Sequence, residues 1–166
     1  MNRPEYWIQH LGLEPHPEGG FYKETYRSSI SIDKKMLPLG YKNARRLATS
    51  IYYLLRSGEI SHFHRLRSDE LWYYHFGSSI RIIIIDQEGH KQTKILGPKI
   101  EKAEHMQVII PAGTIFGAEV IDTVSFGLFG CVVAPGFEFD DFEMYNKEDL
   151  IQAYPKQADI IEKFCR

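Results

Sequence analysis

The sequence predicts an all-β domain of the sandwich or barrel type, with helices at both ends of the chain. Two observations carry this expectation. Between residues 47 and 133, short apolar or alternating segments recur between turns rich in Gly, Pro or charged residues, and no helix-period segment interrupts them. The chain also holds 10 Tyr, 10 Phe and 2 Trp among 166 residues, and such rings suit strands and pocket walls.

The N-terminal region predicts one short helix, then a turn and a strand. Pro4 stands where a helix can begin, and side chains at helical spacing follow it until Gly12, which can end the helix. A turn-rich stretch, residues 15–20 (PHPEGG), leads into residues 21–28 (FYKETYRS), where aromatic side chains and near-alternation indicate a strand. Residues 29–45 are predicted to form a polar loop.

Eight further strands are predicted in the central block. Residues 87–90 (QEGH) have the composition of a hairpin loop, and residues 111–113 (PAG) that of a tight turn. Strands separated by such turns are typical of a sandwich or barrel. The predicted strands are Ala48–Leu55, Glu59–Arg65, Glu70–Phe76, Ile80–Asp86, Lys91–Leu96, Gln107–Ile110, Ile115–Val120 and Val124–Val132.

The C-terminal tail predicts two helices. Asn146 can cap a helix from Lys147 to Tyr154, and Pro155 can begin another that runs to Phe164. No repeat, linker or second hydrophobic block is evident. We therefore expect one domain over residues 1–166, with a barrel core over about 21–143 and C-terminal helices over about 147–164.

An acidic, aromatic run precedes those helices, at residues 137–143 (FEFDDFE). Its composition suits an edge strand or a turn that closes the barrel mouth. We expect Phe137, Phe139 and Phe142 to be buried there. Asp140, Asp141 and Glu143 are expected to lie in solvent.

Charge, hydropathy and cysteine content limit the kinds of binding partner and the cellular compartment that we expect. The net charge is −2, from 20 basic and 22 acidic residues, and no basic cluster could neutralise a run of phosphates, so we expect no nucleic-acid partner. The longest apolar run, residues 82–85, is too short for a bilayer, and the N-terminus lacks a secretion signal. Cys131 and Cys165 form no C-x-x-C pair and are expected to be structural thiols. These features predict a cytoplasmic protein without a membrane partner.

The candidate functional residues gather between residues 58 and 77. Alternation along a strand places His62 and His64 on one face, about 7 Å apart at Cα. Three side chains share a face of the next predicted strand: Glu70, Trp72 and Tyr74. If both faces point inward, these five side chains line one cavity. Two histidines and a carboxylate can hold a metal ion, and the same groups serve general acid and base catalysis.

Two segments resemble the sequence motifs of the cupins. The first cupin motif is Gly, five residues, His-x-His, three or four residues, Glu, six residues and Gly. Residues 58–64 (GEISHFH), with Glu70 and Gly77 after them, resemble it with gaps of three, five and six residues. The second motif is Pro-x-Gly, two residues and His. Residues 111–113 resemble its start, but Phe116 stands where the third histidine ligand is expected.

More specifically, the chain resembles a family of small, mostly uncharacterised bacterial and fungal cupins. The resemblance implies a double-stranded β-helix, the jelly roll for which cupins are known, and a homodimer, but no established reaction. Within this resemblance, the candidate functional positions are His64, Asp69, Glu70 and Trp72. The matching segments are Pro17–Ser28, His64–Gly77, Val108–Glu119 and Cys131–Met144.

A more distant similarity is to the dTDP-sugar 3,5-epimerases, metal-free jelly rolls in which a His base removes a proton next to a ketone. Their signature Arg-Gly-x-Phe-x-Glu resembles residues 19–24 (GGFYKE), with Gly19 in place of the Arg that grips the substrate. His64 matches the general position of the base. By the residues alone, Glu18, Glu24 and Tyr26 have a simpler role as side chains that fix the N-terminal arm.

Three hypotheses follow. The first is a small-molecule-binding cupin without a cofactor, an isomerase or epimerase of a sugar-like or other polar carbonyl compound. His64 is its base and Glu70 orients that base, and the substrate-binding residues are His62, Trp72, Tyr74, Phe116 and Glu24. The second is a ligand-binding jelly roll without catalysis. The third is an enzyme that holds a divalent metal with His62, His64 and Glu70.

Overall fold

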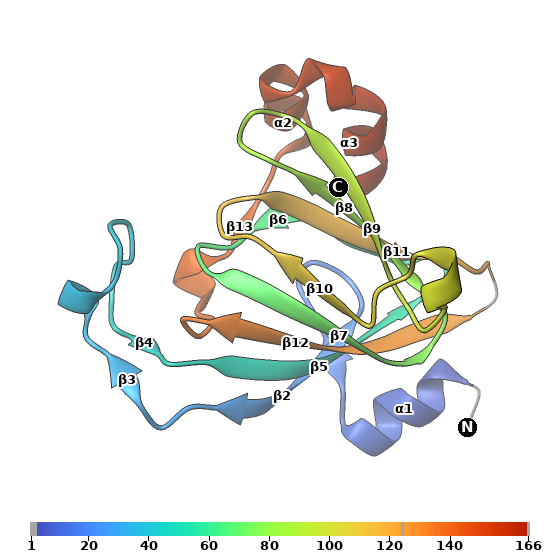
Figure 1. Cartoon of the computed structure of the whole chain (residues 1–166), viewed down its shortest axis with the longest axis horizontal. Helices are drawn as coiled ribbons and strands as arrows, with labels where there is room; N and C mark the ends of the chain where they lie inside the picture. The colour runs from blue at the N-terminus through green and yellow to red at the C-terminus, as the bar shows by residue number, and fades with distance from the viewer. Residues whose placement is uncertain (1–2, 124, 166) are drawn as a thin grey trace.

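Two antiparallel sheets face each other and form the body of the molecule (Figure 1). The computed structural model describes residues 3–123 and 125–165. One sheet has the strand order β1-β2-β5-β12-β7-β10, and the other has the order β13-β6-β11-β8-β9. From β5 to β13 the chain changes sheet at nearly every connection, so β6 and β7 lie on opposite walls. This is the jelly roll that the resemblance implied.

The eight central strands lie within a residue or two of their predicted positions, apart from Val124, which lies outside the described residues. The structure also contains two-residue strands that the sequence did not predict: β1, and the pair β3 (Ser31–Ile32) and β4 (Arg45–Arg46). The short strand β13 begins at the end of the acidic run, for which an edge strand or a turn was expected. The bounds are β1 Glu14–Pro15, β2 Phe21–Arg27, β5 Thr49–Arg56, β6 Ile60–Arg65, β7 Asp69–Gly77, β8 Ile80–Ile85, β9 Lys91–Leu96, β10 Gln107–Ile110, β11 Ile115–Val120, β12 Phe126–Ala134 and β13 Glu143–Met144.

The predicted helices are confirmed at both ends. Helix α1 spans Pro4–Leu11, and Gly12 ends it in the left-handed conformation. Helix α2 spans Lys147–Ala153, and a short 3₁₀ turn at Pro155–Gln157 leads into α3, Ala158–Phe164. Figure 1 shows α2 and α3 over the sheet that contains β6, and α1 beside the other sheet.

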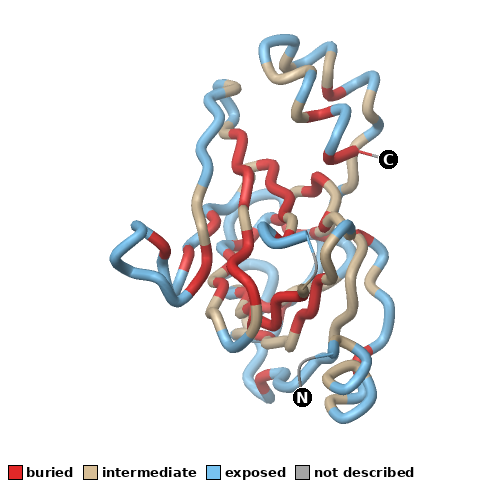
Figure 2. Tube along the Cα trace, turned by 90° about the vertical axis from the view of Figure 1, so that its right-hand side faces the viewer, coloured by how far each residue is buried: buried red, intermediate tan, exposed pale blue. Residues whose placement is uncertain are grey.

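The C-terminal helices cover the outer face of strand β8, which would otherwise expose apolar side chains. It pairs with β9 and β11 and is apolar on both faces. Ile82 and Ile84 face the barrel core, whereas Ile83 and Ile85 pack in a second cluster with Leu150 of α2 and with α3. Figure 2 shows that the buried parts of the chain concentrate in the barrel strands. The apolar run at residues 82–85 is therefore a strand buried on two sides.

The segment 29–45, predicted as a polar loop, is more ordered than expected. It contains the short strand β3, Ser31–Ile32, which pairs with β4, Arg45–Arg46, and the 3₁₀ turn Lys34–Met36 between them. This arm extends away from the barrel (Figure 1). The alternation rule misses these strands because each has only two residues.

An internal ion pair anchors the acidic run, and two expectations for that run are wrong. Asp141 is not in solvent, because Arg45 binds it with two hydrogen bonds, Nε to Oδ2 at 2.5 Å and Nη2 to Oδ1 at 2.8 Å. The side chains of Arg45 and Asp141 are only 1% and 4% exposed. Phe139 is not buried, since 57% of its surface is exposed. Successive side chains of a 3₁₀ turn lie about 120° apart, and Asp141 takes the inward position of the turn Phe139–Asp141, which leaves Phe139 on another side.

No helix among residues 3–123 and 125–165 combines the length and the apolar character needed to cross a membrane.

Replacing Arg45 by Met is expected to destabilise the protein by about 3–5 kcal/mol, because the buried Asp141 would lose both hydrogen bonds and be left with the longer contact of 3.7 Å to Nε of the exposed Arg67. The double variant Arg45→Met/Asp141→Leu is expected to recover a large part of that loss. The measurement is urea unfolding followed by far-UV circular dichroism. Arg65→Met is the matched control, since its ion pair with Glu143 is exposed and such pairs contribute about 0–1 kcal/mol. Equal losses for Arg45→Met and Arg65→Met would contradict this role of Arg45.

Candidate functional site

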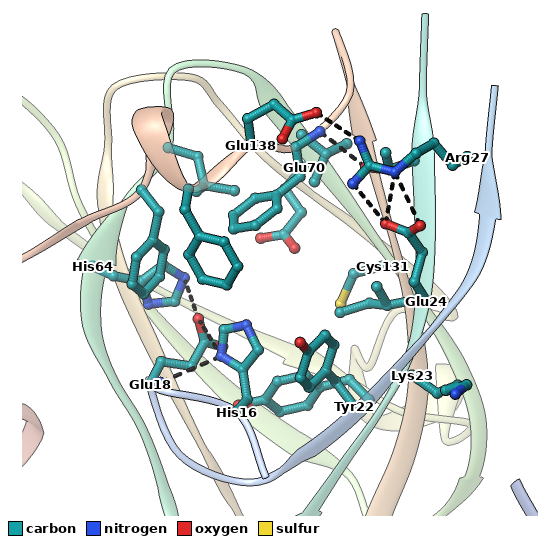
Figure 3. Close-up of a pocket in the computed structure, with 18 of the residues that line it drawn as sticks. His16, Glu18, Tyr22, Lys23, Glu24, Arg27, His64, Glu70, Cys131 and Glu138 are labelled. Carbon is teal, nitrogen blue, oxygen red and sulfur yellow. Dashed lines mark hydrogen bonds and ion pairs between the residues drawn. The ribbon is translucent and has the colours of Figure 1, made fainter. Parts of the chain in front are cut away.

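A cavity of about 340 Å³ opens between the two sheets at the end of the barrel near β2 and the acidic run. It lies toward the small end of the range of pockets that bind small molecules, about 300–1,000 Å³. His64 and Glu70, the two predicted catalytic residues, both line it, as does Glu24. His64 comes from β6 and Glu70 from β7, so they stand on opposite walls (Figure 3).

Glu18 of the loop before β2 makes the central polar contact of the cavity. Its Oε2 lies 3.2 Å from Nε2 of His64, and its Oε1 accepts a hydrogen bond of 2.9 Å from the Ser61 hydroxyl. The side chains of Glu18 and His64 are 7% and 2% exposed. The sequence predicted Glu70 in the role of partner to His64; the structure places Glu18 there.

The backbone of the 15–20 turn carries Glu18 to that place. The backbone N–H of His62 donates to the carbonyl of Glu18 at 2.8 Å, which ties the loop to β6. Gly19 next to it has φ +116°, and a Cβ there would lie 2.1 Å from the carbonyl oxygen of Ile60. Only glycine fits so close an approach with this backbone conformation. The loop therefore depends on Gly19 to bring Glu18 close to β6.

The two ring nitrogens of His64 face two oxygen atoms of the chain, the His62 carbonyl and the Glu18 carboxylate. Nδ1 of His64 lies 2.7 Å from the carbonyl oxygen of His62, and a carbonyl only accepts, so Nδ1 carries a hydrogen. Nε2 and the Glu18 oxygen would both be acceptors if the ring were neutral and Glu18 ionised. The contact of 3.2 Å is therefore a hydrogen bond only when the pair holds one further proton.

His16 faces the same carboxylate from the other side. Burial is the main cause that lowers the pKa of His16, and His64 adds to it, while Glu18 acts against both. A neutral ring fits the contacts: Nδ1 accepts from the backbone N–H of Glu18 at 3.3 Å, rather than donating to the Glu18 carboxylate 3.5 Å away. The hydrogen of the neutral ring is then on Nε2. Figure 3 shows this second nitrogen turned toward the cavity.

Glu70 is a buried carboxyl group in the deep part of the cavity, 7% exposed. Burial first, and then repulsion from Glu18, raise its pKa to about 8. The Trp72 indole and the Cys131 thiol lie near it and act weakly in the opposite direction. These neighbours leave the carboxyl group incompletely paired. Glu70 Oε2 and Trp72 Nε1 have no hydrogen-bond partner among the described residues. Glu70 is therefore a neutral carboxylic acid at pH 7.

An ion-paired arginine stands at the mouth of the cavity. Nη2 of Arg27 donates to Glu24 at 2.8 Å, and Nη1 donates to Glu138 at 2.6 Å. These carboxylates raise the pKa of Arg27. Phe137 and Phe142, from the segment that Arg45 and Asp141 anchor, cover the mouth beside this group. Glu24 thus acts at the entrance of the cavity.

His62 does not face the cavity, contrary to the alternation prediction. The β6–β11 register places Phe116 opposite His64 and Ala118 opposite Ser61, so the single Gly117 lies opposite both His62 and Phe63. This is a β-bulge, and it shifts the alternation by one residue. His62 lies outside the cavity lining, with Nδ1 3.1 Å from the carbonyl oxygen of Phe164 at the end of α3.

Three predicted pocket residues also lie outside the lining. Trp72 is fully buried behind it, stacked on Phe129 with ring centres 4.5 Å apart. Tyr74 uses its hydroxyl to donate to the carbonyl of Gly77, three residues along β7. Phe116 packs against the face of His64, at 4.1 Å between ring centres, and so supports that ring from behind the lining.

The alternative metal set of His62, His64 and Glu70 does not fit this geometry. The bulge turns His62 out toward α3, and Phe116 replaces the third histidine of the cupin pattern. In the described part of the chain, the group of side chains with converging ligand atoms is Asp86, Glu88 and His90, in the exposed hairpin after β8. The residues in the cavity thus favour acid and base chemistry over metal binding.

The sequence prediction missed His16, Glu18 and Arg27 as cavity residues. His16 and Glu18 lie in the PHPEGG turn, a segment that composition alone marks as a connection, and Arg27 is the last residue of β2. Two adjacent glycines after an acidic residue were the available signal, because they permit a close approach to another strand. Nothing in the sequence shows which strand that is.

The buried Glu70 makes stability depend on pH in a defined window. Its folded pKa is raised to about 8 from an ordinary 4.5, so the folded state holds its proton more tightly than the unfolded chain. Stability therefore falls as the pH rises through this window. The wild type is expected to lose up to about 1.4 kcal/mol per pH unit relative to Glu70→Gln there. Urea unfolding from pH 4 to 9 measures this, with the exposed Glu101→Gln as control; a constant difference would contradict it.

Comparisons with known proteins agree on the family. Residues 5–145 match the pattern of the family described as Cupin superfamily (DUF985). The uncharacterised protein YML079W of Saccharomyces cerevisiae is 28% identical over 149 residues, which cover 84% of this chain and 74% of that protein.

Solved structures show the same relation. A hypothetical protein from Leishmania major superposes with a TM-score of 0.91 at 33% identity, over 99% of both chains. Protein SO0799 from Shewanella oneidensis gives 0.90 at 43% identity, over 100% of this chain and 99% of that one. Oxalate decarboxylase from Bacillus subtilis shares the fold alone, with a TM-score of 0.55 and 17% identity over 90% of this chain and 36% of that one. The chain thus belongs to the small cupin family described as Cupin superfamily (DUF985).

Proposed function

We propose that this cupin binds a small polar carbonyl compound in its barrel cavity and moves a proton on the carbon next to the carbonyl, as an isomerase or epimerase. The observation that carries the proposal is the Glu18–His64 pair inside the cavity. A buried imidazole that is held by a carboxylate and a backbone carbonyl is a recurrent arrangement in general base catalysis.

His64 is the base in this proposal. In the contact as it stands, Nε2 of His64 faces Glu18 Oε2. In this proposal, loss of the shared proton leaves two acceptors that repel each other, so Oε2 moves off Nε2 and exposes the electron pair of this nitrogen to the ligand, while Oε1 keeps its hydrogen bond from Ser61. Nε2 then takes the proton from the ligand carbon, and the electrons of that C–H bond form an enolate whose charge lies on the oxygen. Glu18 stabilises the imidazolium that results. Return of the proton to either carbon, or to either face, gives the product.

The proposed chemistry uses groups of the chain itself, so we propose that no metal ion or other cofactor takes part. Support comes from the cavity, where the predicted metal ligands do not converge. We also propose that the protein is cytoplasmic, with no nucleic acid or membrane as partner. The free, buried thiols of Cys131 and Cys165 fit a reducing compartment.

Replacing His64 by Ala is expected to abolish exchange of carbon-bound hydrogen in a ligand. The measurement is deuterium incorporation from D₂O, followed by ¹H NMR, in a panel of uncharged aldoses, ketoses and hydroxyacetone. General base catalysis typically supplies about 10²–10⁴-fold in rate, which sets the size of the loss. His75→Ala, which removes an exposed histidine, is the control. Undiminished exchange in His64→Ala, or no exchange by the wild type, would contradict the proposal.

A second copy of this chain is the proposed partner. Large apolar side chains are exposed near the end of β2, at Tyr26, and along the arm between β2 and β5, at Ile30, Met36, Leu39 and Leu47. Strand β1 pairs with only two residues of β2, which leaves the rest of that edge open. An apolar arm beside an open strand edge suits pairing between identical chains.

Sedimentation equilibrium is expected to give about twice the chain mass of 19.3 kDa for the wild type. The double variant Ile30→Glu/Leu39→Glu is expected to sediment as a monomer, because it places two charges on the apolar arm. Thr93→Glu, an exposed residue of β9, serves as the control. A monomeric wild type would contradict the dimer.

A further inference from the structure

The deep part of the cavity contains hydrogen-bonding groups without partners. Glu70 Oε2 and Trp72 Nε1 are buried and unpaired among the described residues, and Figure 3 shows the Glu70 carboxyl group directed into the cavity. An unpaired buried polar atom costs about 1–3 kcal/mol, so such groups are retained where a ligand or water pairs with them. The Glu70 carboxyl group therefore marks the place where a polar atom of the ligand binds.

The cavity is rich in carboxyl groups and poor in available cations. Five glutamates line it: Glu14, Glu18, Glu24, Glu70 and Glu138. The two permanently charged cations in the lining are Lys23 and Arg27. Arg27 is paired with two carboxylates, and Lys23 is exposed and points away from the cavity in Figure 3. No permanently charged cation of the lining is therefore free to pair with a ligand inside.

This charge balance excludes one class of ligand. An anion that enters the cavity would lose its hydration, meet several carboxyl groups and find no free cation. Proteins that bind carboxylates or phosphates supply paired arginines, lysines or several backbone N–H groups for this purpose. Hence the cavity disfavours carboxylates, sugar phosphates and nucleotide sugars.

We propose that the cavity takes an uncharged carbonyl compound, of the aldose or ketose class, and that the carboxylic acid group of Glu70 donates a hydrogen bond to its carbonyl oxygen. The proposal rests on the proposed function and specifies its ligand. An apolar site that keeps a carboxyl group neutral lets it act as a donor to an oxygen on which negative charge develops. Here the base, His64, stands on one wall and this donor on the other.

The surroundings of Glu70 keep it neutral. The titratable groups that share its part of the cavity are His16 and Glu18 from the loop before β2, Tyr53 from β5, His64 from β6 and Cys131 from β12. None of them is a permanent cation. His16 is neutral, and the Glu18–His64 pair as a whole has no net charge while it holds the shared proton. A carboxylate at Glu70 would thus lack a compensating charge.

The first test needs no ligand. Infrared difference spectra between the wild type and Glu70→Gln are expected to show a protonated carboxyl C=O band at pH 7 that disappears as the pH rises above about 8. Cys131→Ala serves as a second comparison, because it removes the neighbouring thiol and keeps the carboxyl group. A carboxylate at Glu70 at pH 7 would overturn the proposal.

The second test compares sugars that share a carbon skeleton and differ in charge: D-glucose, D-glucuronate and D-glucosamine. Hydroxyacetone and pyruvate form a smaller pair. Saturation-transfer NMR at pH 7 is expected to detect the uncharged member of each set and to show at least tenfold weaker binding of the two anions. Binding of the uncharged member is expected to weaken above pH 8 in the wild type but not in Glu70→Gln, whose amide still donates.

Three results would overturn the inference: tighter binding of an anion, tighter binding of the amine, or no detectable binding of any uncharged member at 10 mM. Failure of the proposed function looks different. If the protein binds D-glucose with this charge selectivity and pH profile but exchanges no hydrogen with D₂O, the inferred ligand class stands and the proposed isomerase activity is wrong. If the protein exchanges carbon-bound hydrogen only in a charged ligand, the proposed isomerase activity stands and the inferred ligand class is wrong.

Discussion

The contact between Glu18 and His64 determines how the cavity is built. It joins the loop before β2 to the wall formed by β6, and it needs Gly19 for the close approach, Ser61 for the second carboxylate oxygen and the His62 carbonyl for the other ring nitrogen. A buried pair of this kind contributes little net stability, because desolvation offsets its attraction. The presence of this pair inside the cavity is better explained by a role in proton transfer than by a role in folding.

The same cavity holds carboxyl groups in three electrostatic states. Glu24 and Glu138 at the mouth are charged and paired with Arg27. Glu18 lies 3.2 Å from Nε2 of His64, and burial and Glu18 raise the pKa of Glu70. Position in the barrel sets these differences, since the mouth is hydrated and the interior is apolar. In the proposed function, groups of one chemical type thereby serve as ion pair at the mouth, partner of the base and hydrogen-bond donor.

The fold was predictable from local patterns, whereas half of the site was not. Ile80–Ile85 and the turns around it define strands by residue type alone, and Asn146 marks its helix by capping. The placement of His62 failed because a bulge opposite Gly117 changes which face a side chain takes. Glu18 was missed because its contact with His64 joins residues 46 positions apart through a loop whose path depends on tertiary packing. Alternation rules contain neither kind of information.

The protonation of His64 tests the account most directly. Long-range ¹H–¹⁵N NMR of ¹⁵N-histidine-labelled protein, with His64 assigned by comparison with His64→Gln, reports the state of each ring nitrogen. We expect a hydrogen on Nδ1 at every pH at which the protein is folded, and a signal from Nε2 that changes in Glu18→Gln. A neutral ring with its hydrogen on Nε2 and a bare Nδ1, unaffected by Glu18→Gln, would contradict it.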